Sequence, residues 1–247
     1  MNTCPININK PKIAIFDLTD CEGCELQFLA LDQKITDFTS KVDIVNWRLV
    51  DNKKDEGPYD ICLIEGTIIT DREKEMVLSL REKSKIVIAI GACACNGGIA
   101  SIIDKNRAKF SRYVYGKDYK PVANNALALD QFIKVDYYLN GCPINPAELE
   151  DFLTKLISGQ QISNKYYPVC YECKNKENLC LLLQGQPCLG PITLGGCGAA
   201  CPSKGIKCYG CWGKIKDANI PALSKILINQ GRTKQEVKQI LELFIKN

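Results

Sequence analysis

Several features common in other proteins are missing from this sequence. The 247 residues include no histidine, so no metal site within them can use an imidazole ligand. No apolar run reaches the roughly 18 residues that a membrane-spanning helix needs. The first residues, Met1 to Ile6, lack the basic and apolar regions of a secretory signal. These absences predict a cytoplasmic protein without a membrane partner.

The excess of positive over negative charge is also small. The formal net charge is only +4, and basic residues alternate with acidic ones, as in Arg72, Glu73, Lys74 and Glu75. Such interleaving is typical of a solvated surface and not of a stripe that binds nucleic acid. We therefore expect no nucleic-acid partner.

Cysteine, in contrast, is abundant, with 15 residues in the chain. An odd number fits poorly with a framework of disulfides. In a reducing cytoplasm, cysteines at this density are more often metal ligands or catalytic thiols than structural bridges.

The first 160 residues alternate between two kinds of segment, within a composition that is 46% hydrophobic and 24% charged. Short apolar, β-branched runs without strict alternation predict strands buried on both faces. They are Lys12–Leu18, Val42–Val50, Asp60–Glu65, Lys85–Ile90 and Val135–Leu139. Helical periodicity marks Glu25–Phe38, Asp71–Lys83, Asn124–Phe132 and Pro146–Ile157, the last with Asn145 as its N-cap. This alternation predicts a flavodoxin-like α/β domain over residues 1–160, with a doubly wound parallel sheet.

The character of the chain changes from Ser163 to Gly213. This stretch holds eight of the 15 cysteines and eight of the 18 glycines, and it lacks helical or strand periodicity. Its few large aliphatic side chains cannot offset an ordering entropy of about 1–2 kcal/mol per residue. We expect a small irregular domain over residues 161–213 that bound metal holds together.

The tail, residues 214–247, becomes helical again. Thr233 and Glu236 have the spacing of a capping box. An apolar stripe follows, made of Val237, Ile240, Leu241, Phe244 and Ile245. We predict C-terminal helices that pack on the body of the protein.

Four cysteines of the first domain follow predicted strands. Cys21 and Cys24 follow the first strand, Cys93 the fourth and Cys142 the fifth, each with a glycine nearby. Ligands of an open parallel sheet bind beyond the carboxyl ends of its strands, and glycine lets the backbone approach a bulky group. Four convergent thiolates match the ligand set of one 4Fe–4S cluster.

Of the three other cysteines, two are expected to have no metal. Cys62 lies in the middle of an apolar strand, where cysteine is a small buried hydrophobe. Cys4 lies in a loose terminus. Cys95 shares a turn with Cys93, and the residues alone do not decide between the two.

The eight late cysteines divide into two sets of four. They are Cys170, Cys173, Cys180, Cys188, Cys197, Cys201, Cys208 and Cys211. Two Cys-x-x-Cys pairs also suit structural zinc sites. The ending Cys197-x3-Cys201-Pro202 is similar to that of a ferredoxin and favours iron–sulfur clusters. The spacing leaves open how Cys188, Cys197 and Cys201 are shared between the two sets.

Taken in order, the motifs resemble those of nickel–iron hydrogenase small subunits. They are Cys-Glu-Gly-Cys at 21–24, Gly-Ala-Cys-Ala at 91–94, Gly-Cys-Pro at 141–143, Cys-Leu-Gly-Pro-Ile-Thr at 188–193, then Cys-Pro and Cys-x-x-Cys. The resemblance spans roughly Lys12 to Gly213 and is greatest to the delta subunits of cytoplasmic sulfhydrogenases.

This resemblance implies three 4Fe–4S clusters. Cys21, Cys24, Cys93 and Cys142 would hold the proximal cluster, and here the family pattern selects Cys93 over Cys95. Cys170, Cys173, Cys180 and Cys188 would hold the distal cluster, and Cys197, Cys201, Cys208 and Cys211 the medial one. The nickel–iron centre would lie in a separate large subunit.

The chain also departs from the pattern of membrane-linked relatives, which use a histidine as one distal ligand. All-thiolate ligation favours a low potential, because histidine ligation raises it. This suits a diaphorase partner that binds flavin and nicotinamide, with an additional iron–sulfur subunit. Glu22 and Glu25, beside the first cysteine motif, could serve proton movement at the interface with the large subunit. We interpret them instead as solvated or capping carboxylates.

The sequence also allows two alternative functions. A cluster subunit of a complex-I-like, quinone-reducing assembly would have adjacent cysteines in the first motif and would lack the late eight. A zinc-stabilised structural or binding protein would explain the late cysteines, but not the placement of the first four at strand ends.

Overall fold

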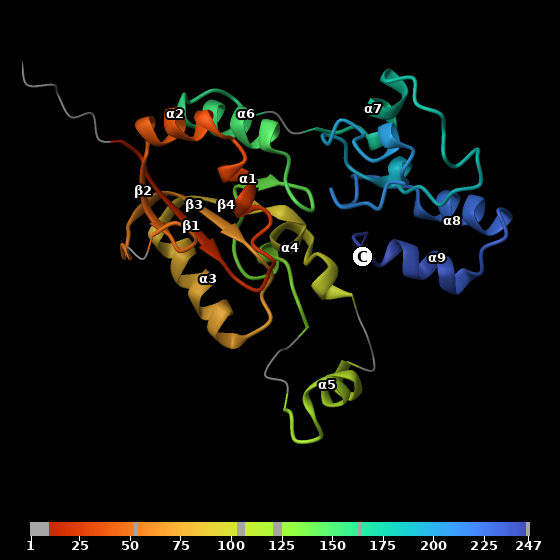
Figure 1. Ribbon diagram of the computed structural model, residues 1–247, viewed down its shortest axis with the longest axis horizontal. Coiled ribbons are helices and arrows are strands. Elements are labelled where there is room, and N and C mark those ends of the chain that lie inside the picture. The colour runs from red at the N-terminus through yellow and green to blue at the C-terminus, as the bar shows by residue number, and fades with distance from the viewer. Residues whose placement is uncertain (1–9, 52–53, 103–106, 121–124, 163–164, 246–247) are drawn as a thin grey trace, which may run out of the picture.

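The computed structural model describes residues 10–51, 54–102, 107–120, 125–162 and 165–245. Figure 1 shows an α/β domain followed by a second lobe, which contains the cysteine-rich segment and the C-terminal tail. Within the described residues, no helix combines the length and the apolar character needed to cross a membrane.

The sheet has five parallel strands in the order β2-β1-β3-β4-β5. Their bounds are β1 (Lys12–Asp17), β2 (Asp43–Trp47), β3 (Tyr59–Glu65), β4 (Ser84–Ile90) and β5 (Tyr137–Leu139). This order is the flavodoxin-like one, so the predicted fold class is confirmed. The second strand is shorter than predicted, because a turn follows Trp47.

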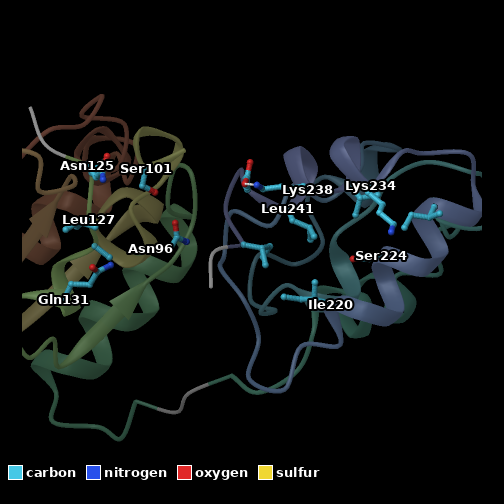
Figure 2. Close-up of a pocket in the computed structure, with 16 residues that line it drawn as sticks. Asn96, Ser101, Asn125, Leu127, Gln131, Ile220, Ser224, Lys234, Lys238 and Leu241 are labelled. Carbon is cyan, nitrogen blue, oxygen red and sulfur yellow. Dashed lines mark ion pairs between the residues drawn. The ribbon is translucent and has the colours of Figure 1, made fainter. Parts of the chain in front are cut away.

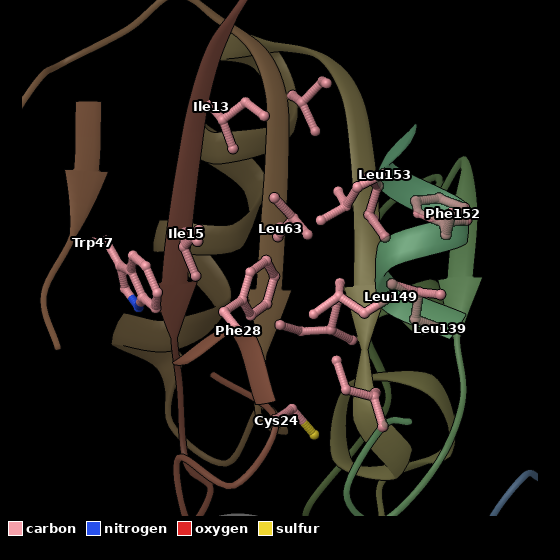
Figure 3. Packing of buried hydrophobic residues seen from close by; sticks show 14 of the residues in the cluster. Ile13, Ile15, Cys24, Phe28, Trp47, Leu63, Leu139, Leu149, Phe152 and Leu153 are labelled. Atoms are coloured by element: carbon pink, nitrogen blue, oxygen red, sulfur yellow. The ribbon is translucent and has the colours of Figure 1, made fainter. Parts of the chain in front are cut away.

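Helices cover both faces of the sheet. On one face, α1 (Glu25–Leu29), α2 (Gln33–Lys41) and α6 (Pro146–Ile157) bury Phe28, Leu149 and Phe152 against the strands (Figure 3). The other face packs against α3 (Asp71–Lys83) and the short α4 (Gly91–Asn96). Since both faces are covered, the strands carry apolar residues on both sides.

One predicted helix of the first domain is divided and another is wrong. The segment Glu25–Phe38 breaks at Asp32, where φ is 52°, into α1 and α2. Asn124 lies outside the described residues, and residues 125–132 contain only an irregular stretch and a 3₁₀ turn at Leu129–Gln131. Leu127 instead exchanges two backbone hydrogen bonds with Ile68, so tertiary pairing overrides the local pattern.

The remaining elements are shorter. The segment between Cys93 and Cys142 carries α5 (Arg107–Tyr115) and a 3₁₀ turn at Ile99–Ser101. The second lobe contains α7 (Val169–Asn175), 3₁₀ turns at Gly190–Ile192 and Pro202–Lys204, then α8 (Ile220–Asn229) and α9 (Lys234–Leu241). Ser163 lies outside the described residues. The helix α7 was not predicted, while the rest of the segment up to Gly213 is irregular as expected.

The C-terminal tail packs on the cysteine-rich segment. Leu223 and Leu227 of α8 and Val237 of α9 form one buried cluster with Leu189 and Ile192. The predicted capping box at Thr233 and Glu236 is present. The segment and the tail therefore share one apolar core.

Candidate metal centres

The carboxyl edge of the sheet brings four cysteines together. Cys21 and Cys24 lie between β1 and α1, Cys93 lies in α4 directly after β4, and Cys142 follows β5. Parallel strands end at the same edge, so residues far apart in sequence converge there.

Their thiols influence one another electrostatically. Burial, together with the neighbouring thiols of Cys142 and Cys21, raises the pKa of Cys93 to about 12. Burial and then Glu65 raise the pKa of Cys24, with a further contribution from Cys93. Such thiols lose their protons readily only when a bound cation compensates the negative charge.

The space beside the sulfurs suits a bulky group. A side chain on Gly91, where φ is +81°, would collide with the Sγ atom of Cys24. A Cβ atom on Gly98 would lie 2.8 Å from the Sγ atom of Cys93. Glycine at both positions leaves room beside the sulfurs, and soft thiolate donors are those that iron–sulfur clusters use. The residues present therefore fit a 4Fe–4S cluster.

The other cysteines of this domain face elsewhere. The Sγ atom of Cys95 lies 3.5 Å from the carbonyl oxygen of Ala89 and 3.6 Å from that of Leu139, to which the thiol donates. Cys62 is fully buried in the core, which confirms its prediction as a small hydrophobe. Cys4 lies outside the described residues.

Sequence reasoning missed Glu65, a buried carboxylate at the same edge. Its two oxygens accept the backbone N–H groups of Cys24 at 3.0 Å and Glu25 at 2.7 Å. It therefore fixes the backbone of the first cysteine motif. Its position as the last residue of β3 was a signal, since strand ends supply the site.

The interpretation of Glu25 as a solvated carboxylate is wrong. Glu25 is buried and accepts a hydrogen bond of 2.7 Å from the indole of Trp47. Burial raises its pKa to about 7, although this hydrogen bond opposes the change. Glu22, in contrast, forms an ion pair with Arg48 at the surface.

The first four late cysteines also form a group. Cys170 and Cys173 lie three residues apart on α7, so their side chains share one face of the helix. Burial, together with the thiols of Cys188, Cys173 and Cys180, raises the pKa of Cys170 to about 12. A Cβ atom on Gly190 would lie 3.1 Å from the Sγ atom of Cys170, so glycine again leaves room beside a sulfur.

The last four cysteines lie near one another in the same way. Burial raises the pKa of Cys211 to about 12, with contributions from the thiols of Cys197 and Cys201. Burial also raises the pKa of Cys208, with contributions from the thiols of Cys188 and then Cys211. Within the described residues, no three Cys, Asp or Glu side chains are close enough to share a single metal ion.

Two contacts connect the three groups in series. The thiols of Cys211 and Cys142 are neighbours, and Cys142 is among the groups that affect the pKa of Cys211. The backbone N–H of Cys208 donates to the Sγ atom of Cys188 at 3.4 Å. The last four cysteines therefore lie between the strand-end group and the group on α7.

A cleft of about 790 Å³ lies apart from these cysteines. Figure 2 shows Ser101, Asn125 and Gln131 of the first domain on one side, with Lys234 and Lys238 of α9 on the other. No described cysteine lines it. The cleft is thus distinct from the candidate metal centres.

Comparison with known families supports the resemblance. The family described as NADH ubiquinone oxidoreductase, 20 Kd subunit, matches residues 21–156. Sulfhydrogenase 2 subunit delta of Pyrococcus furiosus is 37% identical, and the match covers 87% of this chain and 92% of that one. A subunit of the F420-non-reducing hydrogenase vhu of Methanocaldococcus jannaschii is 33% identical over 94% and 93% of the two chains. These relatives extend the match into the late cysteines, beyond the region shared with the 20 Kd family.

Solved structures give the same result. A chain of an NAD⁺-reducing [NiFe]-hydrogenase, 28% identical, superposes with a TM-score of 0.56 over 64% of this chain and 97% of its own. A chain of the actinobacterial-type NiFe-hydrogenase from Ralstonia eutropha shares the fold, with a TM-score of 0.63 and 15% identity over 83% and 79%. The chain therefore belongs to the nickel–iron hydrogenase small-subunit family and is a subunit of an oxidoreductase.

Proposed function

We propose that this subunit holds three 4Fe–4S clusters and passes electrons between the nickel–iron centre of a large subunit and a second redox partner. The proximal set is Cys21, Cys24, Cys93 and Cys142. The medial set is Cys197, Cys201, Cys208 and Cys211. The distal set is Cys170, Cys173, Cys180 and Cys188. The contact series through Cys142, Cys211, Cys208 and Cys188 is the observation that carries this proposal.

The roles of the residues follow from this order. Bound clusters would supply one-electron storage at potentials that the surrounding protein sets. The thiolates hold the clusters in series, and the glycines beside them permit close approach. Cys24, Cys188 and Cys208 are buried, which limits the access of water to the sulfurs.

The partner is proposed from the relatives and from the ligand chemistry. The NAD-reducing hydrogenase HoxS subunit delta of Cupriavidus necator is 25% identical over 61% of this chain. All-thiolate ligation lacks the imidazole that raises the potential of a cluster. Both features favour a cytoplasmic complex with a flavin- and nicotinamide-binding diaphorase and an additional iron–sulfur subunit.

Metal analysis of protein purified without oxygen tests the cluster assignment. Four thiolates per cluster predict about 12 iron atoms and about 12 acid-labile sulfides per chain. The protein is expected to be brown, with broad visible absorption that bleaches on reduction. About four iron atoms, or stoichiometric zinc in a colourless protein, would contradict the proposal.

A further inference from the structure

Glu172 connects the distal and medial sets of cysteines. It lies on α7 between Cys170 and Cys173, yet its carboxylate points to the other set. One oxygen accepts the backbone N–H of Ala199 at 3.1 Å and lies 3.9 Å from the Sγ atom of Cys197. The other oxygen accepts the hydroxyl of Tyr167 at 3.4 Å.

The loop that Glu172 holds has a constrained backbone. Ala199 is fully buried and has a φ of 50°, a conformation that costs free energy for a residue with a side chain. Lys176, the C-cap residue of α7, donates to the carbonyl oxygen of Gly198 at 2.5 Å. Two side chains of opposite charge therefore fix residues 197–199 from the same helix.

We propose that Glu172 is a positioning residue whose charge lowers the reduction potential of the medial centre. The inference rests on the proposed function, because it assumes a cluster bound through Cys197. Reduction adds one electron and hence one negative charge to that centre. A carboxylate 3.9 Å from a ligand sulfur disfavours this charge more strongly than it would in bulk water.

The test is Glu172→Gln in the intact complex, followed by redox titration monitored by electron paramagnetic resonance. Glutamine keeps an oxygen that can accept the N–H of Ala199, so the loop is retained while the charge is lost. We expect the reduced-to-oxidised ratio of the medial centre to rise about tenfold at a fixed potential, which is 59 mV for one electron.

Two further variants separate charge from structure. Glu177→Gln neutralises an exposed carboxylate next to the same helix and should leave the medial potential unchanged. Lys176→Gln removes the opposite charge and should move the potential in the opposite direction to Glu172→Gln. A purely structural role would move both in the same direction or in neither, and would overturn the inference.

Iron content distinguishes the two possible failures. If the Glu172→Gln complex keeps about 12 iron atoms per chain and its medial potential does not move, the role of Glu172 is wrong while the proposed function stands. If the unsubstituted complex shows no medial signal and lacks this iron content, the proposed function itself fails.

Discussion

The two lobes of this subunit are held together by different means. The α/β domain buries large aliphatic and aromatic side chains on both faces of a five-stranded sheet. In the cysteine-rich segment, a buried cluster consists of Val169, Leu181, Ala199, Cys188 and Cys208. Two of these five residues are proposed metal ligands and another is an alanine, so little apolar area is buried there without metal.

The tail changes this contrast in part. Leu189 and Ile192 of the cysteine-rich segment are buried against α8 and α9, so one side of the segment has an ordinary core. Cys197 and Ala199 belong instead to the smaller cluster of the cysteine-rich segment. Packing against the tail therefore stabilises one side of the cysteine-rich segment, and the proposed metal ligation would stabilise the other.

Removal of iron should have the largest effect on the difference in stability between the two lobes. Chelation under reducing, oxygen-free conditions should open the cysteine-rich segment first, because ligation holds its loops. Limited proteolysis should then cut between residues 163 and 213 and leave a protected N-terminal fragment of roughly 160 residues. Resistance of the apo-protein throughout that segment would show that packing, and not metal, holds it.

Substitutions of the neighbouring Cys93 and Cys95 test which of them is a cluster ligand in the first domain. Cys93→Ala should remove one proximal ligand and lower the iron content by about four atoms per chain. Cys95→Ala should keep all the iron and cost only about 1–2 kcal/mol in lost packing, since its thiol faces the core. Iron and sulfide analysis of both variants measures this. Equal iron loss would show that the choice of Cys93 is wrong.

The sequence was most informative where one physical signal dominates. Helices α3 and α6 begin and end where capping residues and apolar spacing predict. A helix over residues 125–132 is wrongly predicted because Ala126, Leu127, Ala128 and Leu129 have high helix propensity. Leu127 instead pairs with Ile68, which follows β3 and is distant in sequence.

The site could be predicted only as far as cysteines mark it. The positions of the cysteines and the ends of the strands can be predicted from the sequence alone. The contacts of Glu65 and Glu172 cannot, since they exist only in the folded chain. Glu65 accepts the backbone N–H of Cys24, 41 residues away, and Glu172 lies beside the thiol of Cys197, 25 residues away. A glutamate without a known neighbour is indistinguishable from a solvated one, as the misreading of Glu25 shows.

Two matched capping boxes provide the finest comparison of the lobes. Thr70 caps α3 in the first domain and Thr233 caps α9 in the second, each accepting a backbone N–H at 3.2 Å from a glutamate three residues on. Glu73 also accepts the hydroxyl of Thr19 at 2.7 Å, which ties α3 to the loop after β1, whereas the cap of α9 is exposed.

We expect Thr70→Ala to cost about 1 kcal/mol of local stability in α3. Thr233→Ala should cost less, and its effect should stay within the first turn of α9, because the hydrogen bonds of that exposed cap join Thr233 and Glu236 of the same helix end. Native-state hydrogen exchange measures both, since faster exchange of the helix amides reports a lower free energy of opening. Thr70→Ser, which keeps the hydroxyl, should restore most of the protection in α3. The opposite outcome would be that Thr233→Ala accelerates exchange across the whole second lobe as much as Thr70→Ala does in α3. That result would show that packing of the tail stabilises the second lobe more than metal ligation does, which would contradict the proposed difference between the lobes.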